Sequence, residues 1–162
     1  MNTLIVLRHA KAAHVPGLAD RERPLTDRGE RDAGRAGETL RQMGLSPDLV
    51  LCSPSTRTRQ TAELALAGLA PDAPVHLESE IYEAYPDELL ELIGRTDDEV
   101  STLLLVGHNP GVHELILNLT LSHDDEGFPP GAFAVLETGA WADLGPGDGR
   151  LVSRWNPKDH PA

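Results

Sequence analysis

The stretch LIVLRHAKA, residues 4–12, decides the fold. Four apolar residues run without a break into Arg8 and His9, and LLLVGHNPG at residues 103–111 repeats the pattern up to His108. Short, continuously apolar runs are typical of strands that are buried on both faces, as they are in parallel sheets. The two runs therefore predict central strands of a parallel sheet, each followed by a histidine at its carboxyl end.

Predicted strands and helices alternate along most of the chain. Periodicity predicts strands over residues 3–7, 48–53, 74–78 and 102–108, and helices over residues 26–44, 53–69, 87–95 and 109–121. This alternation predicts an α/β fold, a three-layer α/β/α sandwich with a mainly parallel central sheet. An antiparallel C-terminal extension is expected from a hairpin over residues 131–139 and 140–144 and a last strand over 149–155. We expect residues 1–162 to form a single domain.

Capping residues predict where three of the helices begin. Thr26 is a good helix cap, and so are Ser53 and Asn109, each of which precedes a proline suited to the first helical position. A helix N-terminus presents free N–H groups and a positive dipole end, which together favour anions. The tail after the last strand, residues 156–162, is expected to be loose.

Composition excludes several classes of function. Acidic residues outnumber basic residues by 26 to 14, and the net charge of −12 opposes binding to nucleic acid or anionic membranes. No apolar run approaches the roughly 20 residues that cross a bilayer, and the N-terminus lacks the pattern of a signal peptide. Because Cys52 is the single cysteine, no intrachain disulfide is possible, and a cytoplasmic location fits best.

Three predicted strands carry polar residues to the same edge of the sheet. These residues are Arg8 and His9, then Ser53 with Arg57 one helical turn later, and finally His108 and Asn109. Ligands of open α/β sheets bind beyond the carboxyl ends of the strands, so we expect these residues to line one substrate-binding pocket. The planar guanidinium of arginine, the imidazole of histidine and the N-terminus of a helix all donate hydrogen bonds. Together they are suited to binding a dianion such as phosphate.

Other chemistries fit the sequence less well. His9 and His14, or His108 and His113, lack the helical i, i+4 spacing and the third ligand of a zinc site, so no metal site is expected. The phosphate-cradling pattern GxxxxGK[ST], the dinucleotide pattern GxGxxG and the serine-hydrolase pattern GxSxG are absent. Cys52 follows an apolar run and is expected to pack in the core.

Four ordered motifs resemble those of the histidine phosphatase superfamily, the group that includes phosphoglycerate mutases. They are LRHAKA at residues 7–12, PLTDRGERDA at 24–33, SPSTRTRQTA at 53–62 and VGHNPG at 106–111. The small size of the chain and the residues of the first and last motifs are most similar to the SixA type. Members of this type are compact phosphatases associated with protein phosphohistidine. Ala10 departs from the pattern, because a glycine commonly follows the first histidine.

The resemblance implies a metal-independent phosphatase that requires no cofactor. His9 would take the phosphoryl group on a ring nitrogen, and water would then release phosphate. The three non-bridging oxygens would be bound by Arg8, Arg57 and His108. The family also places a glutamate as general acid between the third and fourth of these motifs, where this chain offers Glu80 and Glu83, and the context IYE favours Glu83.

The substrate stays open at the level of sequence. The stretch from Arg57 to His108 leaves no room for a lid domain, which predicts an open site for a phosphorylated protein or a small phosphate ester. The leading hypothesis is hydrolysis of protein phosphohistidine. The alternatives are a small-molecule phosphomonoesterase for sugar phosphates or nucleotides, and a non-catalytic module that binds phosphate or a phosphoprotein.

Overall fold

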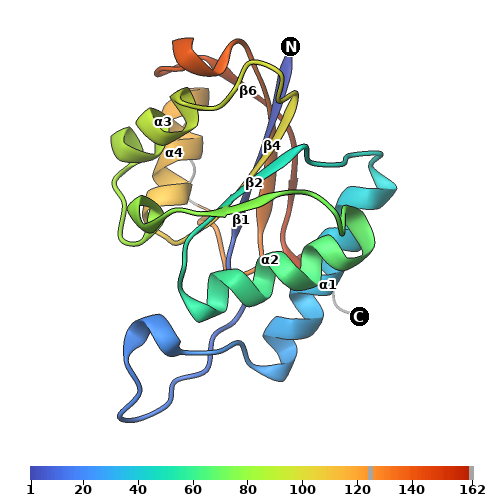
Figure 1. The fold of residues 1–162 in the computed structure, drawn as a ribbon, viewed down its shortest axis with the longest axis vertical. Coiled ribbons are helices and arrows are strands. Elements are labelled where there is room, and N and C mark those ends of the chain that lie inside the picture. Colours follow the sequence, from blue (N-terminus) through green and yellow to red (C-terminus); the bar gives the residue numbers. More distant parts are fainter. Residues whose placement is uncertain (124–125, 161–162) are drawn as a thin grey trace.

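The computed structural model describes residues 1–123 and 126–160. Within these residues a six-stranded sheet has the order β3-β2-β4-β1-β5-β6 (Figure 1). The strands are β1 (Asn2–Arg8), β2 (Leu49–Cys52), β3 (Val75–Leu77), β4 (Thr102–Gly107), β5 (Phe133–Thr138) and β6 (Gly149–Trp155). β3, β2, β4 and β1 are parallel to one another, whereas β5 is antiparallel to both of its neighbours. The predicted parallel sheet with an antiparallel extension is confirmed.

Helices cover both faces of the sheet, which completes the predicted three layers (Figure 1). One face packs against α1 (Asp27–Gln42) and α2 (Thr56–Leu69), and the other against α3 (Pro86–Gly94) and α4 (Gly111–Thr120). Short 3-10 turns are η1 (Asp20–Glu22), η2 (Ser79–Ile81), η3 (Trp141–Asp143) and η4 (Pro157–Asp159). In the ranges described, no helix combines the length and the apolar composition needed to cross a membrane.

The apolar run of β1 is explained by burial on both sides. Leu4 and Val6 belong to the core under α3 and α4, whereas Ile5 and Leu7 belong to the core under α1 and α2. All four side chains are fully buried. Because successive side chains of a strand point to opposite faces, no position within the run can be polar without placing that group in a core. The first charged side chain is Arg8, where the strand reaches the edge of the sheet.

The close packing of α1 against α2 depends on a glycine in the middle of α1. A Cβ atom on Gly37 would lie 2.1 Å from the carbonyl oxygen of Ala65 in α2. A glycine in a helix interior costs about 1 kcal/mol relative to alanine, so its presence here reflects the close approach of the two helices. This contact fixes α2, the helix that carries Arg57, against the rest of the molecule.

Two of the three predicted helix caps are wrong. Thr26 caps α1 as expected, with its side chain accepting a hydrogen bond from the helix. The cap of α2 is Ser55 and not Ser53, because the Ser53 hydroxyl is instead engaged with His108. Asn109 does not cap α4, whose N-terminal cap is Pro110, because the Asn109 amide donates to a carbonyl of another segment.

The predicted C-terminal hairpin has a different partner. β5 pairs with β6, and the segment assigned to the second hairpin strand contains the turn η3. Burial explains the difference, because Trp141 is fully buried and its indole nitrogen donates to the carbonyl of Val100 at 2.8 Å. The tail is packed at least through η4, where Pro157 is buried, and residues 161–162 lie outside the described range.

Candidate active site

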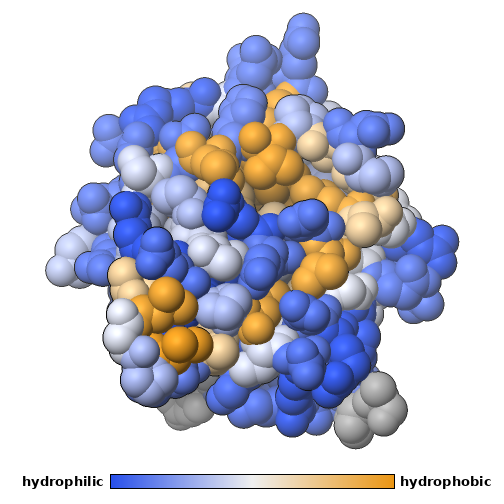
Figure 2. Space-filling model, turned by 60° about the horizontal axis from the view of Figure 1, so that its bottom comes forward, coloured by the Kyte–Doolittle hydropathy of each residue, from blue (hydrophilic) through white to orange (hydrophobic). Residues whose placement is uncertain are grey.

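Three parallel strands bring polar residues to one edge of the sheet. β2, β4 and β1 are neighbours and point in the same direction, and they are followed directly by Ser53, His108 and His9. The ring centroids of His9 and His108 are 5.3 Å apart. Figure 2 brings this side of the molecule forward and shows hydrophilic side chains interleaved with apolar patches. The topology of the sheet therefore assembles groups that are between 44 and 99 residues apart in sequence.

His9 is held in a single tautomer. Its Nδ1 lies 2.8 Å from the carbonyl oxygen of Ala10, and because a carbonyl only accepts, Nδ1 carries the proton and donates it. Nε2 is left with a free lone pair. Burial lowers the pKa of His9 to about 3, and the positive charges of Arg8 and Arg57 also contribute. The ring is therefore neutral at physiological pH and its Nε2 is available as a nucleophile.

His108 is fixed through both of its ring nitrogens. Nδ1 lies 3.3 Å from Nη2 of Arg57, and since a guanidinium only donates, Nδ1 accepts this hydrogen bond. Nε2 lies 2.8 Å from the hydroxyl oxygen of Ser53, to which it donates its proton. Burial lowers the pKa of His108 to about 4, and the neighbouring Arg57 lowers it further, so the ring is neutral in this arrangement.

Ser53 lies behind His108 and not at the surface of the site. Its side chain is fully buried, and it does not line the cavity beside His108. Its carbonyl accepts a hydrogen bond from the Thr58 hydroxyl at 2.8 Å, which anchors the turn between β2 and α2. The sequence predicted that Ser53 binds substrate, whereas its position in the structure is suited to orienting His108.

Two arginines bring positive charge to the site. Arg8 donates from Nη1 to the carbonyl of Phe128 at 3.0 Å, and Arg57 donates from Nη1 to the backbone carbonyl of Asp20 at 2.7 Å. The Nε atoms of both guanidiniums are buried and have no hydrogen-bond partner among residues 1–123 and 126–160. Buried donors without partners are costly, and an anion bound beside these two guanidiniums would offset their positive charge.

Asn109 lies beside Arg8, with its amide turned towards the backbone. Its Nδ2 donates to the carbonyl of Phe128 at 2.8 Å, the same oxygen that accepts from Arg8. Its Oδ1 is buried and has no partner within the described part of the chain. Asn109 and Arg8 therefore fix the segment around Phe128 at the edge of the site. The sequence assigned Asn109 to substrate binding, and it does line the cavity next to His108.

The two candidate general acids occupy different places. Glu83 lines a cavity of about 360 Å³ together with Arg57 and His108. Glu80 lies on the exposed surface, where its carboxylate accepts from Arg95 at 2.7 and 2.9 Å. Of the two, only Glu83 has a position from which it could reach a substrate in this cavity.

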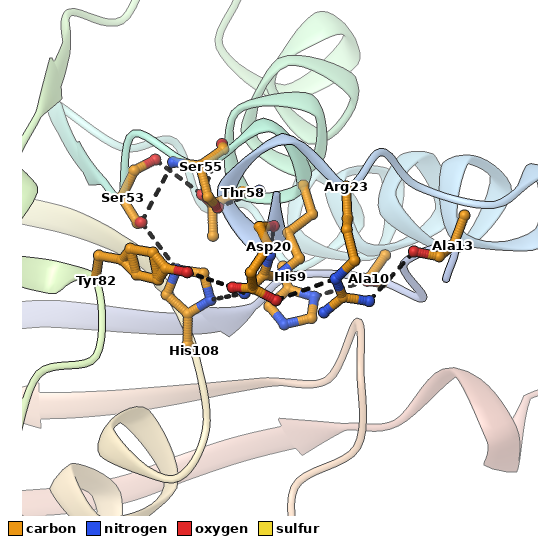
Figure 3. A network of polar contacts seen from close by, with 11 residues as sticks. His9, Ala10, Ala13, Asp20, Arg23, Ser53, Ser55, Thr58, Tyr82 and His108 are labelled. Atoms are coloured by element: carbon orange, nitrogen blue, oxygen red, sulfur yellow. Dashed lines mark hydrogen bonds and ion pairs between the residues drawn. The ribbon is translucent and has the colours of Figure 1, made fainter. Parts of the chain in front are cut away.

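A third carboxylate, Asp20, lies in the site and was not predicted. Its Oδ2 accepts from Nη2 of Arg57 at 3.1 Å and from the hydroxyl of Tyr82, and its Oδ1 accepts from Nε of Arg23 at 3.1 Å. Figure 3 shows Tyr82 and Arg23 reaching this carboxylate from opposite sides, above the two histidines. These donors, the Tyr82 hydroxyl first, hold the pKa of Asp20 well below its usual range. Tyr82 also stacks on His108, with ring centroids 5.3 Å apart.

Sequence reasoning missed Asp20 and Tyr82 because both lie outside the regular elements. Asp20 is in η1, within the loop between the first two motifs, and Tyr82 directly follows η2. Neither position follows a strand, and loops carry no periodicity from which a path can be predicted. The nearest signal was the position of Asp20 just before the PLT motif, together with the IYE context that drew attention to Glu83.

The match to known families agrees with this geometry. The model of the histidine phosphatase superfamily (branch 1) matches residues 4–110, which span the ends of β1, β2 and β4. The chain belongs to the histidine phosphatase superfamily, and the protein is a phosphatase.

Within that superfamily the chain is of the SixA type. The structure of SixA from Nakamurella multipartitia is 34% identical and superposes with a TM-score of 0.86, and the match covers 96% of each chain. A protein histidine phosphatase SixA complexed with tungstate superposes with a TM-score of 0.84 at 22% identity, covering 97% of this chain and 98% of that one, and shows the same fold.

A curated relative matches over nearly the whole chain. Uncharacterized protein Rv1276c from Mycobacterium tuberculosis is 43% identical over 162 residues, which cover 94% of this chain and all of the relative. The similarity therefore extends beyond the residues that the family model matches.

Proposed function

We propose that the phosphatase works without a metal and through a phosphohistidine formed on His9. The observation that carries this proposal is the free lone pair on Nε2 of His9, held in place by the Nδ1 bond to Ala10 beside His108 and Arg57. In the first step Nε2 bonds to phosphorus while the bond from phosphorus to the leaving group breaks. In the second step water attacks the same phosphorus, the bond to Nε2 breaks, and phosphate leaves with His9 neutral again.

The positive groups around His9 supply the electrostatic part of catalysis. Phosphoryl transfer requires positioning and charge stabilisation more than covalent assistance. Arg8 and Arg57 carry fixed charges, and their guanidinium groups would donate to phosphoryl oxygens bound beside His9. These guanidiniums take the role that a metal ion has in other phosphatases.

His108 would contribute a third donor after a change of tautomer. In the structure Nδ1 accepts from Arg57, and Nε2 donates to Ser53. A serine hydroxyl can donate as well as accept, so it allows the proton to reside on Nδ1. A phosphoryl dianion would favour this state, because it attracts the Nδ1 proton and also draws the Arg57 donor towards itself.

For the substrate we favour phosphohistidine on another protein. The support is the similarity to SixA structures, one of which is described as a protein histidine phosphatase. The segment between Arg57 and His108 consists of α2, β3, η2, α3 and β4, all of which belong to the sandwich and none of which forms a lid. A phosphorylated side chain on the surface of another protein could therefore enter the cavity beside His108.

Glu83 supports a second candidate, a phosphomonoesterase acting on small molecules. An alkyl ester needs a general acid to protonate the leaving oxygen, and Glu83 lines the cavity where that oxygen would lie. In this case Glu83→Gln lowers the turnover of phosphoserine and leaves phosphohistidine unaffected, whereas Glu80→Gln changes neither. Equal behaviour of the two variants would remove the support for this candidate.

The test of the main proposal is hydrolysis of p-nitrophenyl phosphate in the presence of a chelator. The wild-type protein should hydrolyse this ester, and the His9→Ala variant should be inactive. Acid-labile, base-stable phosphate should appear transiently on the wild-type chain and not on the variant. His14→Ala is the matched control, since His14 is an exposed histidine a few residues away. Binding of phosphate without turnover by the wild type would point instead to a non-catalytic module.

A further inference from the structure

We propose that Asp20 is the hydrogen-bond acceptor for the leaving group and that it makes the site prefer a nitrogen leaving group, the imidazole of phosphohistidine, over an alkyl oxygen. The proposal rests on the phosphohistidine mechanism at His9 and adds a residue that selects the substrate.

Asp20 lies where the leaving group must be. In a phosphoryl transfer the attacking and leaving atoms are roughly in line, so the leaving group of the first step is on the side of phosphorus opposite Nε2 of His9. The cavity of about 360 Å³ beside His108 is lined by Asp20, Arg57 and Tyr82 but not by His9. We assign the leaving group to this cavity, where the carboxylate of Asp20 would be within its reach.

The carboxylate is positioned by donors from three separate segments. Arg57 belongs to α2, Tyr82 follows η2, and Arg23 follows Asp20 in its own loop. About half of the Asp20 side chain remains exposed, so its oxygens still have lone pairs that are open to a substrate. A carboxylate surrounded by donors is stabilised in its ionised form, and the pKa of Asp20 lies well below its usual range.

An ionised carboxylate can accept a hydrogen bond but cannot provide a proton. Phosphohistidine needs only an acceptor when the ring nitrogen that is not bonded to phosphorus carries a proton. As the N–P bond breaks, its electron pair stays on the ring, and the ring leaves as neutral imidazole with that proton. An N–H hydrogen bond to Asp20 favours the protonated ring and thus the reactive form of the substrate.

An alkyl phosphate presents the opposite requirement. Its oxygen would leave as an alkoxide unless an acid protonates it, and ionised Asp20 has no proton to give. The negative charge of Asp20 also opposes the negative charge that develops on the leaving oxygen. The same residue therefore assists one class of substrate and disfavours the other.

A simpler role for Asp20 makes a different prediction. Asp20 also contacts Arg57 through its carboxylate and its backbone carbonyl, so it could act only by positioning that guanidinium. Arg57 would bind the phosphoryl group of every substrate, so loss of positioning lowers kcat/KM equally for all of them. A positioning role would leave unchanged the ratio of kcat/KM values for two substrates with different leaving groups. This ratio therefore distinguishes the two roles.

The experiment compares phosphohistidine, as the free amino acid, with p-nitrophenyl phosphate, whose leaving group needs no proton. In Asp20→Asn the value of kcat/KM for phosphohistidine should fall by about 10- to 100-fold, the range for losing a hydrogen bond to an ionised group. The value for p-nitrophenyl phosphate should fall at least about 5-fold less, since Asp20 affects this substrate only through its contact with Arg57. Asp20→Glu keeps the carboxylate and should retain the preference for phosphohistidine.

Glu22→Gln is the matched control, because Glu22 lies in the same 3-10 turn and its carboxylate takes no part in this network. It should leave both substrates unchanged. Equal losses for both substrates in Asp20→Asn, or no loss for either, would overturn the role of Asp20 while leaving His9 chemistry intact. A wild-type protein that turns over neither substrate would instead overturn the proposed function itself.

Discussion

The hydroxyl oxygen of Ser53 lies 2.8 Å from Nε2 of His108, on the opposite side of the ring from Arg57. His108 is therefore held between a buried group that can donate or accept and a charged group that only donates. Ser53 can pair with His108 in either tautomer, whereas Arg57 pairs only with an unprotonated Nδ1, so a proton on Nδ1 needs a further acceptor such as a phosphoryl oxygen.

Removal of the Ser53 hydroxyl should weaken His108 as a donor. In Ser53→Ala the Nε2 atom loses its partner, and the ring is no longer fixed in orientation or tautomer. We expect kcat for p-nitrophenyl phosphate to fall by about 5- to 10-fold, the cost of one neutral hydrogen bond. Ser46→Ala, at an exposed serine before β2, is the control. Wild-type kcat in Ser53→Ala would show that His108 is positioned without Ser53.

The guanidinium of Arg57 should be irreplaceable by another cation. Lysine keeps the charge but is a single flexible point donor, whereas Arg57 contacts Asp20 and His108 at once through a planar fork. Arg57→Lys should lower kcat/KM for every phosphate substrate by about 10- to 100-fold. Arg59→Lys, two positions along α2 on an exposed face, should behave like wild type. Comparable activities of the two variants would place Arg57 outside the phosphate site.

Burial of neutral histidines should make the protein sensitive to mild acid. The pKa values of His9 and His108 are lowered to about 3 and about 4, so between these values and the ordinary pKa of about 6.5 the unfolded chain binds protons that the folded chain does not. The contribution of these two histidines to the free energy of unfolding should therefore be constant above about pH 6.5. It should decrease as the pH falls towards 4.

Urea denaturation at pH 7 and pH 5 measures this effect. His9→Asn removes one of the two buried rings, so the variant should lose less stability than wild type between the two pH values. His14→Asn, at an exposed position, should lose as much as wild type. An identical loss in wild type and His9→Asn would mean that His9 is not buried in its neutral form.

Two glycines of α1 should respond to alanine in opposite directions. A Cβ on Gly37 would collide with the backbone of Ala65, whereas a Cβ on Gly34 would meet no atom within 4 Å. Gly37→Ala should lower the free energy of unfolding by about 1 to 3 kcal/mol through overpacking. Gly34→Ala should raise it by roughly 0.5–1 kcal/mol through helix propensity. Thermal or urea unfolding distinguishes the two, and equal shifts would contradict the packing of α1 on α2.

The architecture could be predicted from sequence because burial determines it. The apolar run of β1, buried on both faces, requires helices on both sides, and the ends of parallel strands lie at a common edge. The meeting of His9 and His108 follows from the adjacency of β1 and β4. Position alone left Arg57, Arg59 and Gln60 as candidates, and the resemblance to the family selected Arg57, which lies in the first turn of α2.

The remaining parts of the site depend on information that local patterns do not contain. Ser53 was assigned as a cap because its type and its position before proline fit that role, but a buried histidine competed for the hydroxyl. Asp20 reaches Arg57 through an irregular loop, and Trp141 replaced an expected strand with a turn because its ring fills the core. In each case a long-range contact prevailed over a local preference.

The central strand β1 is the first to be synthesised, yet its neighbours are among the last. β4 begins at Thr102 and β5 at Phe133, so about a hundred residues must leave the ribosome before β1 gains either partner. Until then the apolar side chains of β1 and its unpaired backbone groups have no native cover, and contacts over such long loops form slowly. The nascent chain therefore exposes β1 to non-native contacts until β4 and β5 have been synthesised, and recovery of enzymatic turnover during refolding would report the pairing of β1 with β4.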